Sequence, residues 1–197
     1  MKTTTAIVST AIAALAANAA GGILELDFAG NGGSGLLPGN EVGANTADSD
    51  TSNAIGGEVG GGLTYDDATN VLSFDFEFSG LNGGLFDAAS GIHFHIAAPG
   101  VDPLNETGGI AYNLNSGTDA NVSLSTPLVA IGASSGRVTG TANILPEDVA
   151  DLLAGNFYLN IHSGDFTGGE LRGNIVPAPG AAGVLALAGA ATLRRRR

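Results

Sequence analysis

A strict two-residue alternation of apolar and polar side chains runs through residues 71–79, VLSFDFEFS. Successive side chains of a β-strand point to opposite faces of a sheet, whereas an α-helix repeats every 3.6 residues. The pattern therefore predicts a half-buried strand and excludes an amphipathic helix. Its apolar members are Leu72, Phe74, Phe76 and Phe78, and its polar members are Ser73, Asp75 and Glu77.

Similar but shorter patterns recur along the chain between Gly-rich and Asn-rich turns. The expected strands lie in residues 23–30, 57–65, 91–97, 109–114, 136–144, 157–161 and 168–175, with a hairpin turn at 66–70. Residues 145–155, LPEDVADLLAG, predict one short helix that begins near Pro146 and stops at Gly155. The sequence therefore predicts an all-β fold, an antiparallel Greek-key sandwich or barrel with one short helix. Residues 31–57 are expected to be the least ordered part.

The chain has 197 residues and no cysteine, so disulfides and thiolate metal sites are excluded. Residues 21–176 are expected to fold as one domain, since a body of this size buries about 70% of its unfolded surface. Of the 7 basic residues, only Arg137 and Arg172 lie within this body, against 19 acids. The resulting net charge of about −17 disfavours contact with nucleic acids and anionic lipids.

Residues 1–20, MKTTTAIVSTAIAALAANAA, have the layout of a secretory signal peptide. Lys2 precedes an apolar run, and Ala17-Asn18-Ala19 fits an A-x-A cleavage site. The alternative is a buried N-terminal helix. We therefore expect an exported protein.

The other end, residues 177–197, joins prolines, an apolar run and four arginines. This layout resembles the PEP-CTERM sorting signal, although Ala178 replaces its usual acidic residue. The resemblance implies processing by a bacterial exosortase, a transient anchor in the membrane, and release to the cell surface or its surroundings. The alternative is a permanent C-terminal transmembrane helix. The residues that carry the resemblance are Pro177, Pro179, Arg194, Arg195, Arg196 and Arg197.

Two of the three histidines of the chain stand in GIHFHIAAPG, at His93 and His95. Alternation places Ile92 and Phe94 in the core and both imidazoles on the opposite, polar face. His162 follows the strand NFYLNI, where Tyr158 and Asn160 share its face. If the two strands are adjacent, the three imidazoles form a ligand set suited to Cu or Zn. The alternative is a structural cluster bonded to the backbone, Asp165 or Glu170.

The order of segments over residues 37–175 resembles a CHRD domain. The resemblance begins with LPGNEVGAN, continues through LTYDDATNVLSFDFEFSGL and HFHIAAPG, and ends with LPEDVADLLAGNFYLNIHSGDFTGGELRGNI. It implies an exported β domain. The histidines also resemble the copper half of the copper/zinc superoxide dismutases, which implies His93, His95 and His162 as ligands and Arg172 as a guide for anions.

Two functions are compatible with this sequence. The first is an exported binding or structural protein of the cell surface or matrix, with an exosortase-type enzyme as processing partner and polysaccharide or surface proteins as further partners. The alternative is a Cu- or Zn-binding redox protein built on the three histidines, with Arg172, Glu170 and Asp165 in support. Because no nucleophile motif accompanies the histidines, the residues favour a non-enzymatic role and leave an enzymatic one open.

Overall fold

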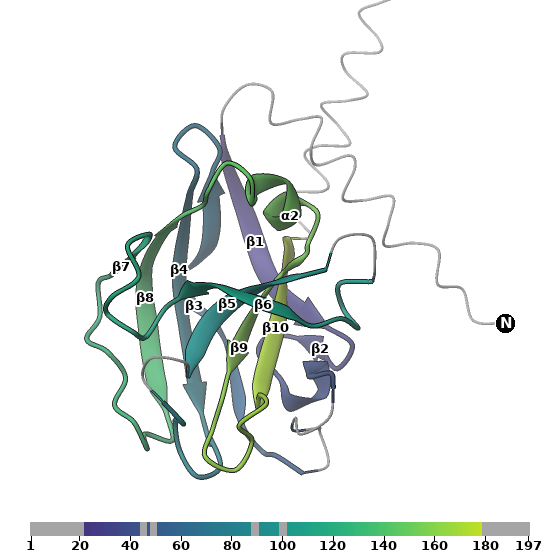
Figure 1. Cartoon of the computed structure of the whole chain (residues 1–197), viewed down its shortest axis with the longest axis vertical. Helices are drawn as coiled ribbons and strands as arrows, with labels where there is room; N and C mark the ends of the chain where they lie inside the picture. The colour runs from purple at the N-terminus through teal and green to yellow at the C-terminus, as the bar shows by residue number, and fades with distance from the viewer. Residues whose placement is uncertain (1–21, 44–46, 48–50, 88–90, 99–101, 179–197) are drawn as a thin grey trace, which may run out of the picture.

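The computed structural model describes residues 22–43, 47, 51–87, 91–98 and 102–178 (Figure 1). Most of this part of the chain is β-structure. Its strands are β1 (Ile23–Gly30), β2 (Gly33–Ser34), β3 (Ile55–Asp66), β4 (Val71–Ser79), β5 (Ile92–Ala97), β6 (Gly108–Asn113), β7 (Val122–Leu124), β8 (Gly136–Asn143), β9 (Phe157–Ile161) and β10 (Leu171–Pro177). A 3-10 helix (Pro38–Asn40) and one α-helix, α2 (Val149–Leu153), complete the described elements.

The strands form one antiparallel sheet in the order β6-β5-β9-β10-β1-β3-β4-β8-β7, with β2 paired to β1. The chain passes three times between the β5-β6-β9-β10 half and the β3-β4-β7-β8 half, through the connections 80–91, 114–121 and 144–156. Strand β1 joins the two halves by pairing with both β10 and β3. The predicted all-β antiparallel sandwich or barrel with one short helix is therefore confirmed.

The core lies between the two halves of the sheet, where aromatic side chains from distant strands meet. The rings of Phe74 on β4 and Phe94 on β5 contact edge to face at 5.7 Å, and those of Phe28 and Phe76 do so at 6.0 Å. The apolar members of the alternating pattern in β4 are all buried. Each such side chain contributes about 1.5–3 kcal/mol on transfer from water, so the alternation that predicts β4 also specifies which face it buries.

The predicted hairpin joins β3 to β4 through residues 67–70. Asn70 adopts φ 57°, a left-handed conformation that asparagine tolerates in tight turns. Its backbone carbonyl accepts a hydrogen bond from Ile144 N–H at 2.8 Å, which ties the turn to the residue that follows β8. On the outer face of β4, Asp75 pairs with Arg137 at 2.7 Å.

The predicted helix is shorter than the sequence pattern indicates. Residues 146–148 form a turn, and only Val149–Leu153 are helical. Leu152 is buried against the core, and Gly155 ends the segment at φ 79°. The helix thus covers one end of the sheet on the path from β8 to β9.

Two boundaries differ from expectation. Residues 31–43 are organised rather than loose, because Leu36 is fully buried and bridges Gly56. Pro177, which the sequence pattern assigns to the C-terminal tail, is the last residue of β10 and pairs with Leu26.

The predicted signal peptide, Pro179 and the four terminal arginines lie outside the described residues. Within the described ranges, no helix is long and apolar enough to cross a bilayer.

Candidate metal centre

Strand pairing brings the histidine segments together. Strand β9 lies between β5 and β10, with His93 opposite Asn160 and His95 opposite Tyr158. On its other side, Asn160 lies opposite Arg172 and Tyr158 opposite Asn174. Because directly opposite residues share a face, the polar side chains form two rows across the sheet. The rows are His93–Asn160–Arg172 and His95–Tyr158–Asn174.

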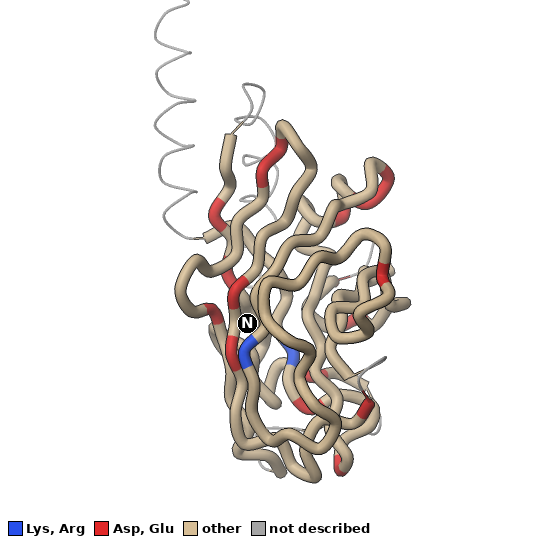
Figure 2. Tube along the Cα trace, turned by 90° about the vertical axis from the view of Figure 1, so that its left-hand side faces the viewer, with Lys and Arg blue, Asp and Glu red and all other residues tan. Residues whose placement is uncertain are grey.

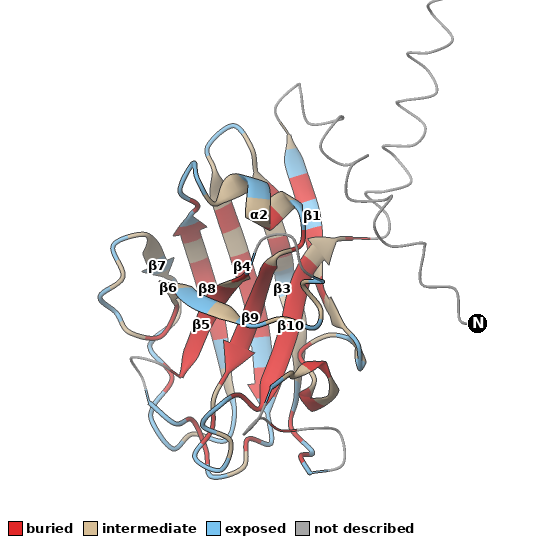
Figure 3. Ribbon diagram, turned by 45° about the vertical axis from the view of Figure 1, so that its right-hand side comes forward, coloured by how far each residue is buried: buried red, intermediate tan, exposed pale blue. Residues whose placement is uncertain are grey.

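The polar rows are buried, which corrects the expectation of an outward, polar face. Figure 3 shows β5, β9 and β10 buried along most of their lengths. His93 is 1% exposed, Tyr158 is 1% exposed and Arg172 is 0% exposed. Loops cover the side of the sheet that alternation assigns to solvent, so β9 is buried on both faces.

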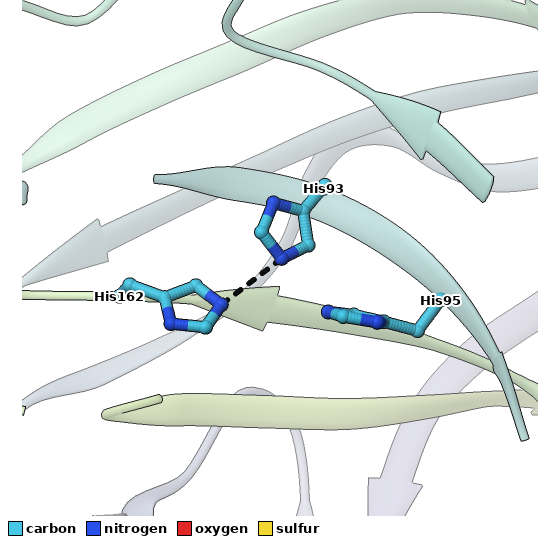
Figure 4. A group of neighbouring side chains, drawn as sticks. All are labelled: His93, His95 and His162. Atoms are coloured by element: carbon cyan, nitrogen blue, oxygen red, sulfur yellow. Dashed lines mark hydrogen bonds between the residues drawn. The ribbon is translucent and has the colours of Figure 1, made fainter. Parts of the chain in front are cut away.

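The three imidazoles converge beneath these loops, with His93 and His95 on β5 and His162 directly after β9 (Figure 4). The Nε2 atoms of His93 and His162 are 3.0 Å apart. One ring nitrogen from each histidine lies within 4.8 Å of the others. Two nitrogens bound to one ion at about 2.0–2.1 Å lie roughly 3.3–3.5 Å apart, so small side-chain movements would bring all three onto a metal.

Main-chain carbonyls fix which nitrogen can bind a metal in two of the rings. His95 Nδ1 donates to the Gly108 carbonyl at 2.9 Å, and His162 Nδ1 donates to the Thr167 carbonyl at 2.8 Å. Since a carbonyl only accepts, the neutral rings keep their lone pairs on Nε2. His95 Nε2 is buried without a hydrogen-bond partner. Histidines that ligate metals usually donate their other ring N–H in this way.

The site favours neutral imidazole. Burial, with a smaller contribution from the neighbouring His95 and His162, lowers the pKa of His93 to about 2. Burial also lowers the pKa of His95 to about 4, against the opposing effect of the Gly108 carbonyl. The pKa of His162 is lowered by burial as well. Three neutral imidazoles can coordinate a transition metal without a net loss of protons.

Tyr158 links the histidines to Arg172. Its ring stacks on His95 at 4.7 Å with an interplanar angle of 5°, and the Arg172 guanidinium carbon lies 3.7 Å from the ring centroid. The Arg172 guanidinium also donates to the carbonyls of Pro103 and Glu106 at 2.8 and 2.9 Å. Arg172 thus holds the loop over the site, and full burial keeps its charge from meeting an anion at the surface.

The segment that follows Leu36 forms a second part of the cover. Leu37 bridges Arg172 through the backbone, and Asn40 Nδ2 donates to the Arg172 carbonyl at 3.0 Å. Glu41 accepts a long hydrogen bond from Asn160 Nδ2 at 3.4 Å. Burial raises the pKa of Glu41 to about 8 despite the nearby Arg172, so this carboxyl is mostly protonated at pH 7.

The other two predicted supporting residues lie apart from the cluster. Glu170 is fully buried, and its carboxylate accepts hydrogen bonds from Ser52 Oγ at 2.6 Å and Asn82 N–H at 3.0 Å. Asp165 is exposed in the turn, and its backbone N–H donates to the Asn82 carbonyl at 3.3 Å. The structure therefore brings Arg172 to the histidines through Tyr158 and keeps Glu170 and Asp165 in other contacts.

Sequence reasoning missed Glu41 and the loop around Pro103 as parts of the site. Glu41 stands in LPGNEV, the stretch that begins the CHRD resemblance. Its place in this stretch is the one sequence feature that points to a role for Glu41. The carbonyls of Pro103, Glu106 and Gly108 have no indication in the sequence, since every residue carries such a group.

The fold and the buried polar face define an antiparallel β-sandwich protein with a three-histidine cluster under its loops. Comparison with known families gives a match to the CHRD domain over residues 35–175. The chain belongs to the CHRD domain family, as the sequence resemblance predicts, and this family is typically extracellular. No curated protein and no solved structure matches the chain.

Proposed function

We propose that this chain is an exported CHRD-domain protein that binds one Cu or Zn ion through His93, His95 and His162. The observation that carries the proposal is the convergence of the three imidazoles, with two of them fixed by carbonyls so that Nε2 faces the cluster. Imidazole nitrogen suits both metals. Rigid strands hold two of the ligands, and the hairpin β9–β10 positions the third.

Measurement of bound metal tests this proposal. The purified full-length chain is treated with a chelator and then equilibrated with Zn²⁺, with Cu²⁺, or with Cu⁺ under ascorbate. We expect about one ion per chain, because the described residues form a single three-histidine cluster. His93→Ala, His95→Ala and His162→Ala should each lose most of it, whereas Asn143→Ala, on the exposed side of β8, should retain it. Binding at background level, or unchanged binding in all three histidine variants, would contradict the proposal.

A second candidate function, as a structural or binding component of the cell surface or matrix, is favoured by the charge of the surface. Figure 2 shows acidic residues distributed over the described chain and few basic ones. Of the two body arginines, Arg172 is buried and Arg137 is paired with Asp75. Such a surface suits soluble display in a polysaccharide matrix, where cations bridge acidic groups. If this is the main role, His93→Ala would leave the amount of matrix-associated protein unchanged.

The PEP-CTERM resemblance supports sorting by an exosortase-type enzyme. A reporter fused to residues 177–197 tests this in a bacterium that carries an exosortase. We expect loss of the tail from the mature reporter, detected by mass spectrometry, and retention of the tail when the exosortase gene is deleted. Equal masses in both strains would exclude this route and favour a permanent anchor.

A further inference from the structure

The cluster contains no anionic ligand, and this limits the charge of the ion that it can hold. Among the described residues, the only group of His, Cys, Asp and Glu side chains with metal-ligand spacing consists of the three histidines alone. Of the buried carboxyl groups, that of Glu170 accepts hydrogen bonds from Ser52 and Asn82. That of Glu41 accepts one from Asn160 and is mostly protonated at pH 7, since burial raises its pKa to about 8. The protein ligands would therefore not neutralise any of the positive charge of a bound cation.

The closest buried charge adds to this positive charge instead of balancing it. Arg172 lies against Tyr158, whose other neighbour is His95, one of the proposed ligands. Nη2 of the guanidinium donates to two carbonyls, and Nη1 is buried without a hydrogen-bond partner. Between described residues, Arg137–Asp75 is the only ion pair. The charge of Arg172 is thus uncompensated by direct pairing and repels a second cation in the same low-dielectric region.

Because the site is buried, the charge of the ion determines the cost of moving it from water into the site. His93 is 1% exposed and His95 is 9% exposed. The cost of moving an ion from water into a protein interior scales with the square of its charge, so a dication pays roughly four times as much as a monocation of similar size. The described chain supplies three ligands, so Zn²⁺ would also need a water molecule in its fourth position.

From this charge distribution we infer that the three-histidine centre selects Cu⁺ over Zn²⁺. The inference rests on the proposed metal-binding function and specifies its ligand. Three neutral nitrogens leave a Cu⁺ complex with a net charge of +1, the smallest that these metals allow. The positive Arg172 behind Tyr158 then disfavours the divalent ion more than the monovalent one.

Competition titrations on the purified full-length chain test the inference. Under anaerobic, reducing conditions, bicinchoninate competes for Cu⁺, and a chromophoric chelator competes for Zn²⁺ in a separate titration. We expect Cu⁺ to bind at least about 10-fold more tightly than Zn²⁺, because the ion-burial penalty differs by more than the free energy of that ratio. A smaller preference, or a preference for Zn²⁺, overturns the inference but leaves metal binding intact. Absence of binding by both ions overturns the inference and the proposed function together.

Arginine variants test the cause of the selectivity. Arg172→Met removes the charge and should narrow the ratio of the two affinities by about 10-fold, since the dication loses twice as much repulsion. Arg172→Lys keeps the charge and should keep the ratio, even if loss of the loop contacts weakens both affinities. Arg137→Met is the matched remote control and should change neither. An unchanged ratio in folded Arg172→Met overturns the electrostatic cause, and if this variant does not fold, the wild-type ratio still decides the inference.

Discussion

The Nε2 atoms of His93 and His162 lie 3.0 Å apart, although the residues are separated by 69 positions in the chain. His162 donates its Nδ1 proton to the Thr167 carbonyl, so its Nε2 atom can only accept. In the metal-free protein, the contact therefore requires a proton on His93 Nε2. A metal bound at this atom would move that proton to His93 Nδ1, which is buried without a partner.

This proton arrangement predicts a tautomer change on metal binding. In long-range ¹H–¹⁵N NMR spectra of the metal-free protein at pH 7, His93 should be protonated at Nε2, and His95 and His162 at Nδ1. Saturation with Cu⁺ or Zn²⁺ should convert His93 to the Nδ1-protonated form and leave the other two unchanged. Observation of His93 protonated at Nδ1 before metal is added would refute the proposed hydrogen bond.

The metal-free protein should lose stability in acid through its buried histidines. The folded-state pKa values of His93 and His95 are lowered to about 2 and about 4, against 6.5 for the free group. Below pH 6.5, the unfolded chain therefore binds more protons, and the free energy of unfolding falls until the pH reaches the folded-state pKa of each histidine. Urea unfolding between pH 7 and pH 4 should show a decline of about 1 kcal/mol per pH unit for each histidine.

A double variant separates this effect from that of the carboxylates. His93→Gln/His95→Gln should decline less steeply than the wild type between pH 6.5 and pH 4. The lowered pKa of Asp75, about 2, adds its own loss of stability only at lower pH. Identical slopes for the two proteins would show that these imidazoles are not held neutral by burial.

Glu41 should produce the opposite trend at higher pH. Its folded-state pKa is raised from 4.5 to about 8 by burial, so its contribution to stability is complete below pH 4.5 and is lost as the pH rises through 8. Glu41→Gln cannot ionise, and its side-chain oxygen can still accept the hydrogen bond from Asn160 Nδ2. This variant should therefore lose less stability than the wild type between pH 6 and pH 9 in urea titrations. Glu147→Gln, an exposed control, should follow the wild type, and coincidence of all three curves would contradict a neutral Glu41.

The parts of the fold that follow from local sequence are those with strict periodicity or turn chemistry. The alternation in residues 71–79 specifies β4 and its buried face, and Asn70 marks the turn before it. The sequence pattern predicts a longer helix than Val149–Leu153, because Pro146, Glu147 and Asp148 suit a turn as well as a helix start. Local patterns describe single elements, so they do not state which strands become neighbours.

The candidate site illustrates the same limit. Alternation places His93 and His95 on one face, but their meeting with His162 depends on β5 pairing with β9, a contact between distant segments. Burial of that face depends on loops around Leu37 and Pro103, which are held by hydrogen bonds to backbone carbonyls. Such bonds involve atoms common to all residues, and they leave no pattern in the sequence.

Arg172 should control the mobility of the loop over the site. Its guanidinium binds two carbonyls of that loop, at Pro103 and Glu106. In hydrogen–deuterium exchange, Arg172→Lys should therefore increase exchange of the amides in residues 104–108 while β3 and β4 stay protected. We expect a loss of about 1–3 kcal/mol in the free energy of unfolding, since buried acceptors lose charged partners. Unchanged exchange in this loop would show that other contacts, such as Asn174 with Pro103, suffice to hold it.

Gly169 should tolerate no side chain, because it lies against both Glu41 and Asn160. A Cβ atom there would lie 2.7 Å from Asn160 Oδ1 and 2.7 Å from Glu41 Oε1, and its φ of 134° is rare for other residues. Gly169→Ala should thus strain the backbone and also displace the side chains of Glu41 and Asn160. Gly33→Ala is the matched control, with φ 136° and only the Leu37 side chain, at 3.4 Å, near its Cβ position, so it reports backbone strain of about 1–3 kcal/mol alone. Thermal unfolding should show a larger loss of stability for Gly169→Ala than for the control, and metal binding should weaken in Gly169→Ala only. Equal losses of stability would mean that the contact with Glu41 and Asn160 does not constrain the site.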